Sequence, residues 1–251
     1  QFQNSLSSNI SSFISAFSQT GADYNMSVIT TDTWTISSVL NSSTPNVEQE
    51  LSNLVIQGTY GSGMEKGIEM SYRALSSSTS AGPGSSFWRD DATLIVIYVS
   101  DEKDWSNPVW SSYISFFDSL KPAGQFIPYG VISDVPSGCQ YTASNGATRT
   151  LQPGLGYWDL IDYYGGSWYS ICATDWGVQL QNLAGELTGR KMFQLDEPDP
   201  IVDTIEVFVN GQIVTDWEYD ESTNSVIFLQ DSIPEEGQTI IIEYAVWGCE
   251  D

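Results

Sequence analysis

Histidine is absent from the 251 residues of this chain, and its absence removes several kinds of catalytic site. Ser-His-Asp and Cys-His enzymes need an imidazole as their general base, and many zinc sites need it as a ligand. Most common hydrolase mechanisms are therefore excluded. Chemistry that uses glutamate or a metal ion alone remains open, but we expect a protein that is not an enzyme.

Basic residues are scarce: 8 Lys and Arg stand against 32 Asp and Glu, which gives a formal net charge of −24. A surface this negative repels phosphate backbones, so we expect no nucleic-acid binding, whereas it suits divalent cations. Long apolar runs are also missing, because no stretch approaches the roughly 18–20 residues that a membrane-spanning helix needs. We therefore expect a soluble chain with no membrane span.

Cysteine is sparse as well, with only Cys139, Cys172 and Cys249 in the sequence. Three thiols cannot all pair within one chain. Outside the cell two of them can form a disulfide, which leaves the third free or bonded to another chain; in the cytosol all three stay reduced. The abundance of Ser, Thr, Gly, Asn, Trp and Tyr with little Lys favours an extracellular protein, whether secreted, cell-surface or part of a virion.

Up to about Lys191, patterns typical of helices alternate with patterns typical of strands. Apolar residues at helical spacing predict a helix over Leu6–Phe17, followed by a buried strand over Asn25–Asp32 and an edge strand over Thr33–Ile36. The other predicted elements are helices over Val47–Ile56, Met64–Leu75, Val109–Lys121, Tyr157–Gly166 and Asp175–Gly189, and strands over Thr93–Val99, Phe126–Ser133 and Trp168–Ala173. This alternation predicts an α/β fold, a doubly wound, mostly parallel sheet with helices on both faces.

The last sixty residues have a different character. From Phe193 to the end there are 15 Asp and Glu and no Lys or Arg, and the sequence consists of short strand-like stretches. Asn210-Gly211 is typical of a two-residue β-hairpin turn, and Asp220–Asn224 predicts another turn. We therefore predict two domains, an α/β domain over residues 1–192 and a small acidic β-sandwich over residues 193–251.

The strand predicted at Thr93–Val99 runs directly into a cluster of polar residues. Ser100, Asp101, Glu102 and Asp104 follow it within the segment "YVSDEKDWS". Parallel sheets bind ligands beyond the carboxyl ends of their strands, so this position predicts a ligand site.

The order "VITTD … GTYGSGMEKGIE … FWRDDATLIVIYVSDEKDWS … GVISD … GC … YYGGSWYSICATDW" resembles a bacterial or phage branch of the von Willebrand factor A (vWA) domain family, over roughly residues 1–190. The resemblance implies a Rossmann-like fold with a metal-ion-dependent adhesion site (MIDAS) at the top of the sheet. Hydroxyl and carboxylate oxygens suit Mg²⁺ or Ca²⁺, with one coordination position left for a partner's carboxylate.

Two metal ligands follow from this resemblance. Asp101 matches the family's Asp after the fourth strand, and Ser62 matches its Thr or Ser, with Thr59 as the competing choice. Glu102 and Asp104 are either ligands of a neighbouring Ca²⁺ or solvated loop carboxylates, and the second interpretation is favoured. The family's disulfide falls on Cys139 and Cys172.

One family element is missing, because no D-x-S-x-S motif occurs in the chain. Gln1–Phe17 resembles the helix that follows that motif, so we expect the chain to begin after the family's first strand. Three explanations stay open: the strand lies in an upstream part that was cleaved or omitted, another chain donates it, or this protein lacks it and the metal site is inactive.

These observations lead to two principal hypotheses about function. The first is a non-enzymatic adhesion or protein-binding module with a Mg²⁺- or Ca²⁺-dependent site at the carboxyl edge of the sheet. The alternative is a structural subunit of a virion or extracellular filament, with a vestigial metal site. In both cases we expect protein partners and an oligomeric assembly. A metal-dependent hydrolase ranks third, because no nucleophile is paired with a base.

Overall fold

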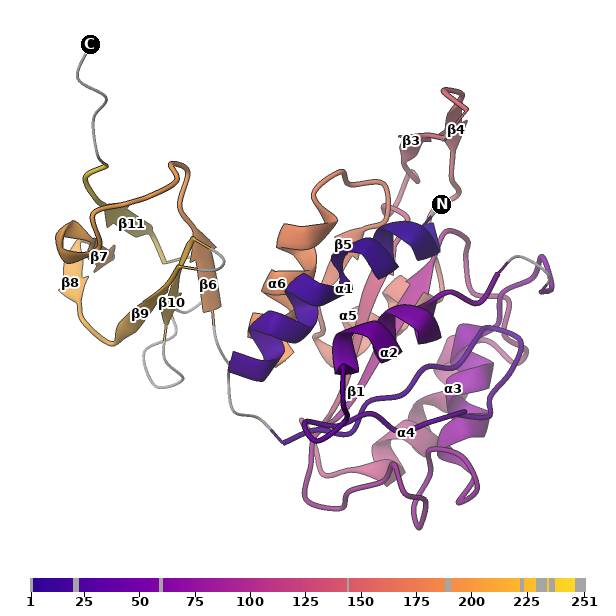
Figure 1. Ribbon diagram of the computed structural model, residues 1–251. Coiled ribbons are helices and arrows are strands. Elements are labelled where there is room, and N and C mark those ends of the chain that lie inside the picture. The colour runs from indigo at the N-terminus through magenta and orange to yellow at the C-terminus, as the bar shows by residue number, and fades with distance from the viewer. Residues whose placement is uncertain are drawn as a thin grey trace. The chain divides into compact units, whose positions relative to one another are not determined.

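The computed structural model describes residues 2–19, 23–58, 61–143, 145–187, 191–221, 224–228, 234 and 238–246. The chain divides into two compact units, one formed by Gln1–Ile14 and Asp23–Gln179 and the other by Ser15–Ala22 and Leu180–Asp251. The fold is mixed α/β. The first unit contains a small parallel sheet, and the second contains two small antiparallel sheets (Figure 1).

The parallel sheet has three strands in the order β1 (Leu94–Ser100), β2 (Phe126–Ile132) and β5 (Trp168–Ser170). β1 and β2 pair in parallel along their whole length. β1 is a nearly continuous apolar run, and β2 combines β-branched and aromatic residues with Pro128 and Gly130. Such apolar strands are typical of parallel sheets with covered faces. The strands predicted at these three places are confirmed.

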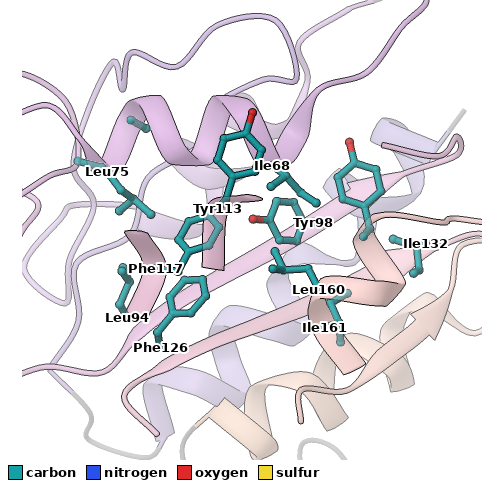
Figure 2. Close-up of a cluster of buried hydrophobic side chains, with 13 residues drawn as sticks. Ile68, Leu75, Leu94, Tyr98, Tyr113, Phe117, Phe126, Ile132, Leu160 and Ile161 are labelled. Atoms are coloured by element: carbon teal, nitrogen blue, oxygen red, sulfur yellow. The ribbon is translucent and has the colours of Figure 1, made fainter. Parts of the chain in front are cut away.

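One face of this sheet is covered by a large apolar core (Figure 2). Leu94 and Tyr98 of β1 and Phe126 of β2 lie in this core, and Phe117 stacks on Phe126 with ring centroids 4.7 Å apart. The helical contributors to the core are α3 (Gly67–Leu75), η1 (Trp110–Tyr113), α4 (Ile114–Leu120) and α5 (Tyr157–Tyr164). Each large apolar side chain buried there contributes about 1.5–3 kcal/mol.

The opposite face carries a second apolar cluster, because successive strand residues point to opposite sides of a sheet. Val99 of β1 and Val131 of β2 pack there with Phe2 and Leu6 of α1 (Phe2–Gln19). Trp176, the first residue of α6 (Trp176–Leu187), belongs to the same cluster. Helices therefore contribute side chains to both faces of the parallel sheet.

Helix α2 (Val47–Val55) follows Pro45 and buries Leu51. The hydroxyls of Ser52 in α2 and Ser7 in α1 share a hydrogen bond of 2.6 Å, which connects the two helices. The helices predicted at these places are confirmed.

The strands predicted over Asn25–Asp32 and Thr33–Ile36 do not form. Met26 makes only an isolated bridge with Leu40. Thr30 and Thr33 close a tight turn, in which the Thr33 N–H donates to the Thr30 hydroxyl oxygen (2.8 Å) and the Thr30 N–H donates to the Thr33 carbonyl (3.1 Å). Such threonine hydroxyls compete with a strand partner for backbone donors. Within the described residues, β1 is consequently an edge strand of the parallel sheet.

A disulfide joins Cys139 and Cys172, with Cα atoms 6.1 Å apart. Cys139 precedes the hairpin formed by β3 (Gln140–Thr142) and β4 (Thr148–Thr150), and Cys172 follows β5. The pairing implied by the family resemblance is therefore confirmed, while Cys249 lies outside the described residues. A structural disulfide is typical of an oxidising compartment. No helix in the described part of the chain is both long and apolar enough to span a membrane.

The second unit contains two antiparallel sheets that share one apolar core, in which Val207, Val226 and Phe228 are fully buried. Asn210 and Gly211 both have positive φ and form the predicted hairpin turn. The strands in sheet order are β6 (Lys191–Gln194), β10 (Ser225–Phe228) and β9 (Trp217–Asp220) in one sheet, and β11 (Ile240–Glu243), β7 (Glu206–Val209) and β8 (Gln212–Val214) in the other, with η2 (Val202–Thr204) before β7. The predicted boundary between residues 192 and 193 falls inside β6.

Candidate functional site

The start of α3 is capped by side chains from two other parts of the chain. Its first three N–H groups, in chain order, donate to Tyr157 Oη (3.0 Å), Asp104 Oδ1 (3.3 Å) and Ser106 Oγ (2.8 Å). The first amides of a helix have no acceptor within the helix, and a carboxylate there also interacts favourably with the helix dipole. These contacts fix the loop after β1 against α3.

Asp104 is the central residue of this cap. Its carboxylate also accepts hydrogen bonds from the Ser106 hydroxyl (2.9 Å) and from the Ser106 N–H (3.1 Å). Burial raises the pKa of Asp104, and the hydrogen bonds from Ser106 and Ile68 oppose that rise. The interpretation of Asp104 as a solvated loop carboxylate is therefore wrong, because the carboxylate is partly buried and accepts hydrogen bonds from α3 and Ser106.

Glu65 lies beside the end of β1. The hydroxyl of Ser100, a residue only 3% exposed, donates a hydrogen bond to Glu65 Oε2 and accepts one from the Glu102 N–H (3.2 Å). Burial is the main reason that the pKa of Glu65 is raised; the negative charges of Asp101, Glu102 and Asp32 raise it further, while the hydrogen bond from Ser100 lowers it. Four carboxylates from three segments of the chain thus gather at the carboxyl edge of the sheet.

Ser62 lies in an exposed turn next to Asp32. The Ser62 N–H donates to Asp32 Oδ2 (2.8 Å), and its hydroxyl oxygen accepts from the Met64 N–H (3.1 Å). Gly61 approaches the Asp32 carboxylate so closely that a Cβ there would overlap it. The competing choice, Thr59, lies outside the described residues.

Asp101 directly follows β1 and is partly buried. Its charge acts on Glu65, so it belongs to the same acidic group as Asp32, which holds Ser62. No hydrogen bond joins Ser62 to Asp101 in the part of the chain described here. Ser62 and Asp101 are linked only indirectly in these residues: Asp32 holds Ser62, and the charges of Asp32 and Asp101 both act on Glu65.

The residues described do not form a preassembled metal centre. Within them, no three His, Cys, Asp or Glu side chains are grouped so that they could hold an ion. Mg²⁺ and Ca²⁺ need several oxygen ligands in one shell. The proposed coordination by Ser62 and Asp101 therefore stays a prediction.

Exposed apolar side chains flank the acidic residues. Met64, Trp105 and Leu155 are 52%, 40% and 42% exposed, and we call these three the carboxyl-edge patch. Backbone hydrogen bonds fix the positions of Trp105 and Leu155: the Trp105 N–H donates to the Glu65 carbonyl (2.7 Å), and the Asp104 N–H donates to the Leu155 carbonyl (2.8 Å). Large apolar side chains that are held in solvent mark interaction surfaces.

A cation lies on one side of this patch. Lys103 Nζ is 3.8 Å from the centroid of the Trp105 ring, which is a cation–π contact. The contact holds the indole in one orientation and places a positive charge beside a largely acidic edge.

Neither a family model nor a curated protein nor a solved structure matches this chain. The resemblance to vWA domains therefore stays a prediction.

Several residues of the site were not predicted from the sequence. The sequence does not indicate Asp32 and Glu65 as site residues, because each becomes part of the acidic group only through folding. The spacing of Asp104 and Ser106 is compatible with a cap, but the helix that they cap lies more than thirty residues earlier in the chain. The sequence predicts the position of the carboxyl end of β1, whereas its contacts with Glu65 and with the start of α3 depend on the tertiary structure.

Proposed function

We propose that this protein is a non-enzymatic protein-binding module whose partner docks on the carboxyl-edge patch. The observation that carries the proposal is the exposure of Met64 and of the backbone-anchored Trp105 and Leu155 beside the carboxylates of Glu65 and Asp101. Aromatic and large aliphatic residues are the usual anchors of protein interfaces, and fixed backbones lose little entropy on binding. The partner that fits carries apolar side chains next to Lys or Arg.

We infer a doubly wound, Rossmann-like domain of the vWA type, followed by a small β-sandwich. The sheet order β1, β2, β5 and the helical side chains on both faces support the first part, and the core shared by two antiparallel sheets supports the second. The disulfide supports an extracellular location.

Selection from a display library of random peptides tests the binding function. Selected peptides are expected to combine apolar residues with Lys or Arg, and to bind a Trp105→Ala/Leu155→Ala variant at least about tenfold more weakly, since interface anchors contribute 1–2 kcal/mol or more. The matched control is Ile213→Ala, a residue that is 59% exposed in the second unit. Equal affinity for the wild type and the double variant would show that the carboxyl-edge patch is not the binding surface.

A structural subunit of a virion or extracellular filament is the second candidate function. Two observations favour it: the described residues contain no metal-binding group of three side chains, and β1 is an edge strand there. Asp101→Ala distinguishes the two functions. An adhesion module that uses this site loses partner binding and keeps its assembly state, whereas a structural subunit with a vestigial site is unaffected in both measurements.

A further inference from the structure

The open edge of β1 is a second surface suited to protein recognition. β1 is a seven-residue apolar strand, and in the described part of the structure it pairs with β2 alone. Native edge strands are normally short, or are blunted by charged residues, proline or bulges. The strand LIVIYVS contains none of these residues, so its free side is a template for another strand.

The phase of the β1–β2 ladder identifies the backbone groups on the open side. In a parallel sheet, alternate residues of a strand bond to alternate neighbours. The Leu94 N–H donates to the Gln125 carbonyl (2.7 Å), so Leu94 and every second residue after it face β2. The N–H and C=O groups of Ile95, Ile97 and Val99 therefore point to the open side. Among the described residues, no backbone hydrogen bond satisfies them.

These three residues are also accessible. Ile95, Ile97 and Val99 are each only partly buried, whereas β2 is buried along almost its whole length. Because these residues are partly buried, leaving their N–H and C=O groups unpaired costs free energy. An added strand therefore gains hydrogen bonds as well as apolar contact.

Charge selects the occupant of this edge. Asp101 and Glu102 follow the strand directly, and Asp90 and Asp91 lie shortly before it. A second copy of the chain, paired through the same edge, would place carboxylates against carboxylates in either strand direction. Like charges facing each other across an interface are destabilising, and each copy carries a formal net charge of −24. A partner with a basic residue beside Asp101 and Glu102 avoids this repulsion.

We propose that the open edge of β1 binds an extended segment of a partner protein by strand addition. The segment is apolar along Ile95–Val99 and carries Lys or Arg at the end that lies beside Asp101. Main-chain hydrogen bonds to Ile95, Ile97 and Val99 provide affinity, and the carboxylates of Asp101 and Glu102 favour a basic residue at that end of the added strand. Its main-chain contacts do not involve Met64, Trp105 or Leu155 of the carboxyl-edge patch, although Asp101 borders both surfaces.

Amide hydrogen exchange measured by NMR on the full chain tests whether the edge is open. The amides of Ile95, Ile97 and Val99 are expected to exchange at least about tenfold faster than those of Val96 and Tyr98, which bond to β2. Equal protection of both sets would show that the edge is already paired, and that result would overturn the proposal.

Synthetic peptides test the occupant without changing the protein. The probe is a peptide of alternating Val and Thr that ends in two lysines, prepared with the lysines at either end. At least one of the two is expected to bind and to slow exchange at Ile95, Ile97 and Val99. Replacing its lysines with glutamates is expected to weaken binding at least about tenfold. Equal binding of the acidic peptide would refute the predicted charge of the partner.

Methylation of the peptide backbone separates strand addition from other binding modes. N-methylation of the alternate amides that face β1 is expected to abolish binding, and N-methylation of the other set is expected to preserve it. If both sets behave alike, the peptide does not add as a strand, and the proposal fails.

A protein variant gives an independent test. Ile97→Pro removes an N–H from the open side and leaves the bonds to β2, a position at which edge strands tolerate proline. Peptide binding is expected to fall at least about tenfold, and the control Ile97→Val is expected to bind as the wild type does. Trp105→Ala/Leu155→Ala is expected to leave this binding unchanged, which separates it from the proposed function. A concentration-dependent dimer of the wild type that Ile97→Pro abolishes would instead identify a second copy as the occupant.

Discussion

The buried hydroxyl of Ser100 donates a hydrogen bond to the carboxyl group of Glu65, across 35 residues of sequence. This contact fixes the end of β1 to the loop that precedes α3. It also keeps Glu65 in a partly buried position near Asp101, Glu102 and Asp32, where ionisation is unfavourable. Ionisation of Glu65 therefore makes the stability of this edge of the sheet depend on pH.

Replacement of Glu65 by Gln is expected to raise the melting temperature at neutral pH. Because burial raises the pKa of Glu65 above its ordinary value of 4.5, its contribution to stability is fully present below that value and is lost as pH rises through the folded-state pKa. The amide oxygen of Gln still accepts the Ser100 hydrogen bond but carries no charge. Thermal unfolding at a series of pH values is the measurement.

The difference between the Glu65→Gln variant and the wild type is expected to shrink as pH falls toward 4.5. The pKa of Asp104 is raised as well, but Asp104 is present in both proteins and so does not produce this difference. Glu206→Gln, at an exposed position in the second unit, is the control. A variant less stable than the wild type at neutral pH would contradict the prediction.

Replacement of Tyr157 by Phe is expected to destabilise the protein by about 1–3 kcal/mol, because it leaves the buried Gly67 N–H without an acceptor. Tyr157 is fully buried, and its hydroxyl accepts that hydrogen bond at 3.0 Å. Urea unfolding gives the free energy. Tyr163→Phe, at a residue that is 54% exposed, is the matched control. Equal stability of the two variants would show that the α3 cap contributes nothing measurable.

Removal of the disulfide by Cys139→Ser/Cys172→Ser is expected to cost roughly 3–4 kcal/mol, because the bond closes a loop of 33 residues in the unfolded chain. The measurement is denaturant unfolding of the double variant and of the wild type. Reductant is expected to lower the stability of the wild type and to leave the double variant unchanged. A wild type that is insensitive to reductant throughout unfolding would argue against the bond.

Binding of a cation at the predicted site is expected to stabilise the fold. If Ser62 and Asp101 hold Mg²⁺ or Ca²⁺, a cation concentration of about 100 times Kd stabilises the fold by about 2.7 kcal/mol. Asp101→Ala and Ser62→Ala are expected to abolish this gain, and Asp203→Ala, at an exposed residue of the second unit, is expected to keep it. Thermal unfolding with either cation and with EDTA is the measurement. If neither cation shifts the melting temperature of the wild type, the predicted cation site is wrong.

Most helices and the strands of the parallel sheet were predictable, because their apolar spacing reflects burial that each segment needs locally. The strand predicted over Asn25–Asp32 does not form, and the reason is nonlocal. Its composition favours a strand, but a strand also needs a neighbour, and Thr30 instead directs the backbone into a turn with Thr33. In the site, the end of β1 was predictable, whereas Asp32 and Glu65 were not, because their environment comes from distant segments.

The sequence by itself determined the acidic character, the absence of histidine chemistry and the position of polar residues at the end of β1, since these are properties of composition and local pattern. Only the tertiary structure decided that Asp104 caps α3, that Glu65 bonds to Ser100 and that β1 is an edge strand. Hydrogen-bond partners here lie 35 to 90 residues apart, and a local pattern carries no information on which distant donor meets which acceptor.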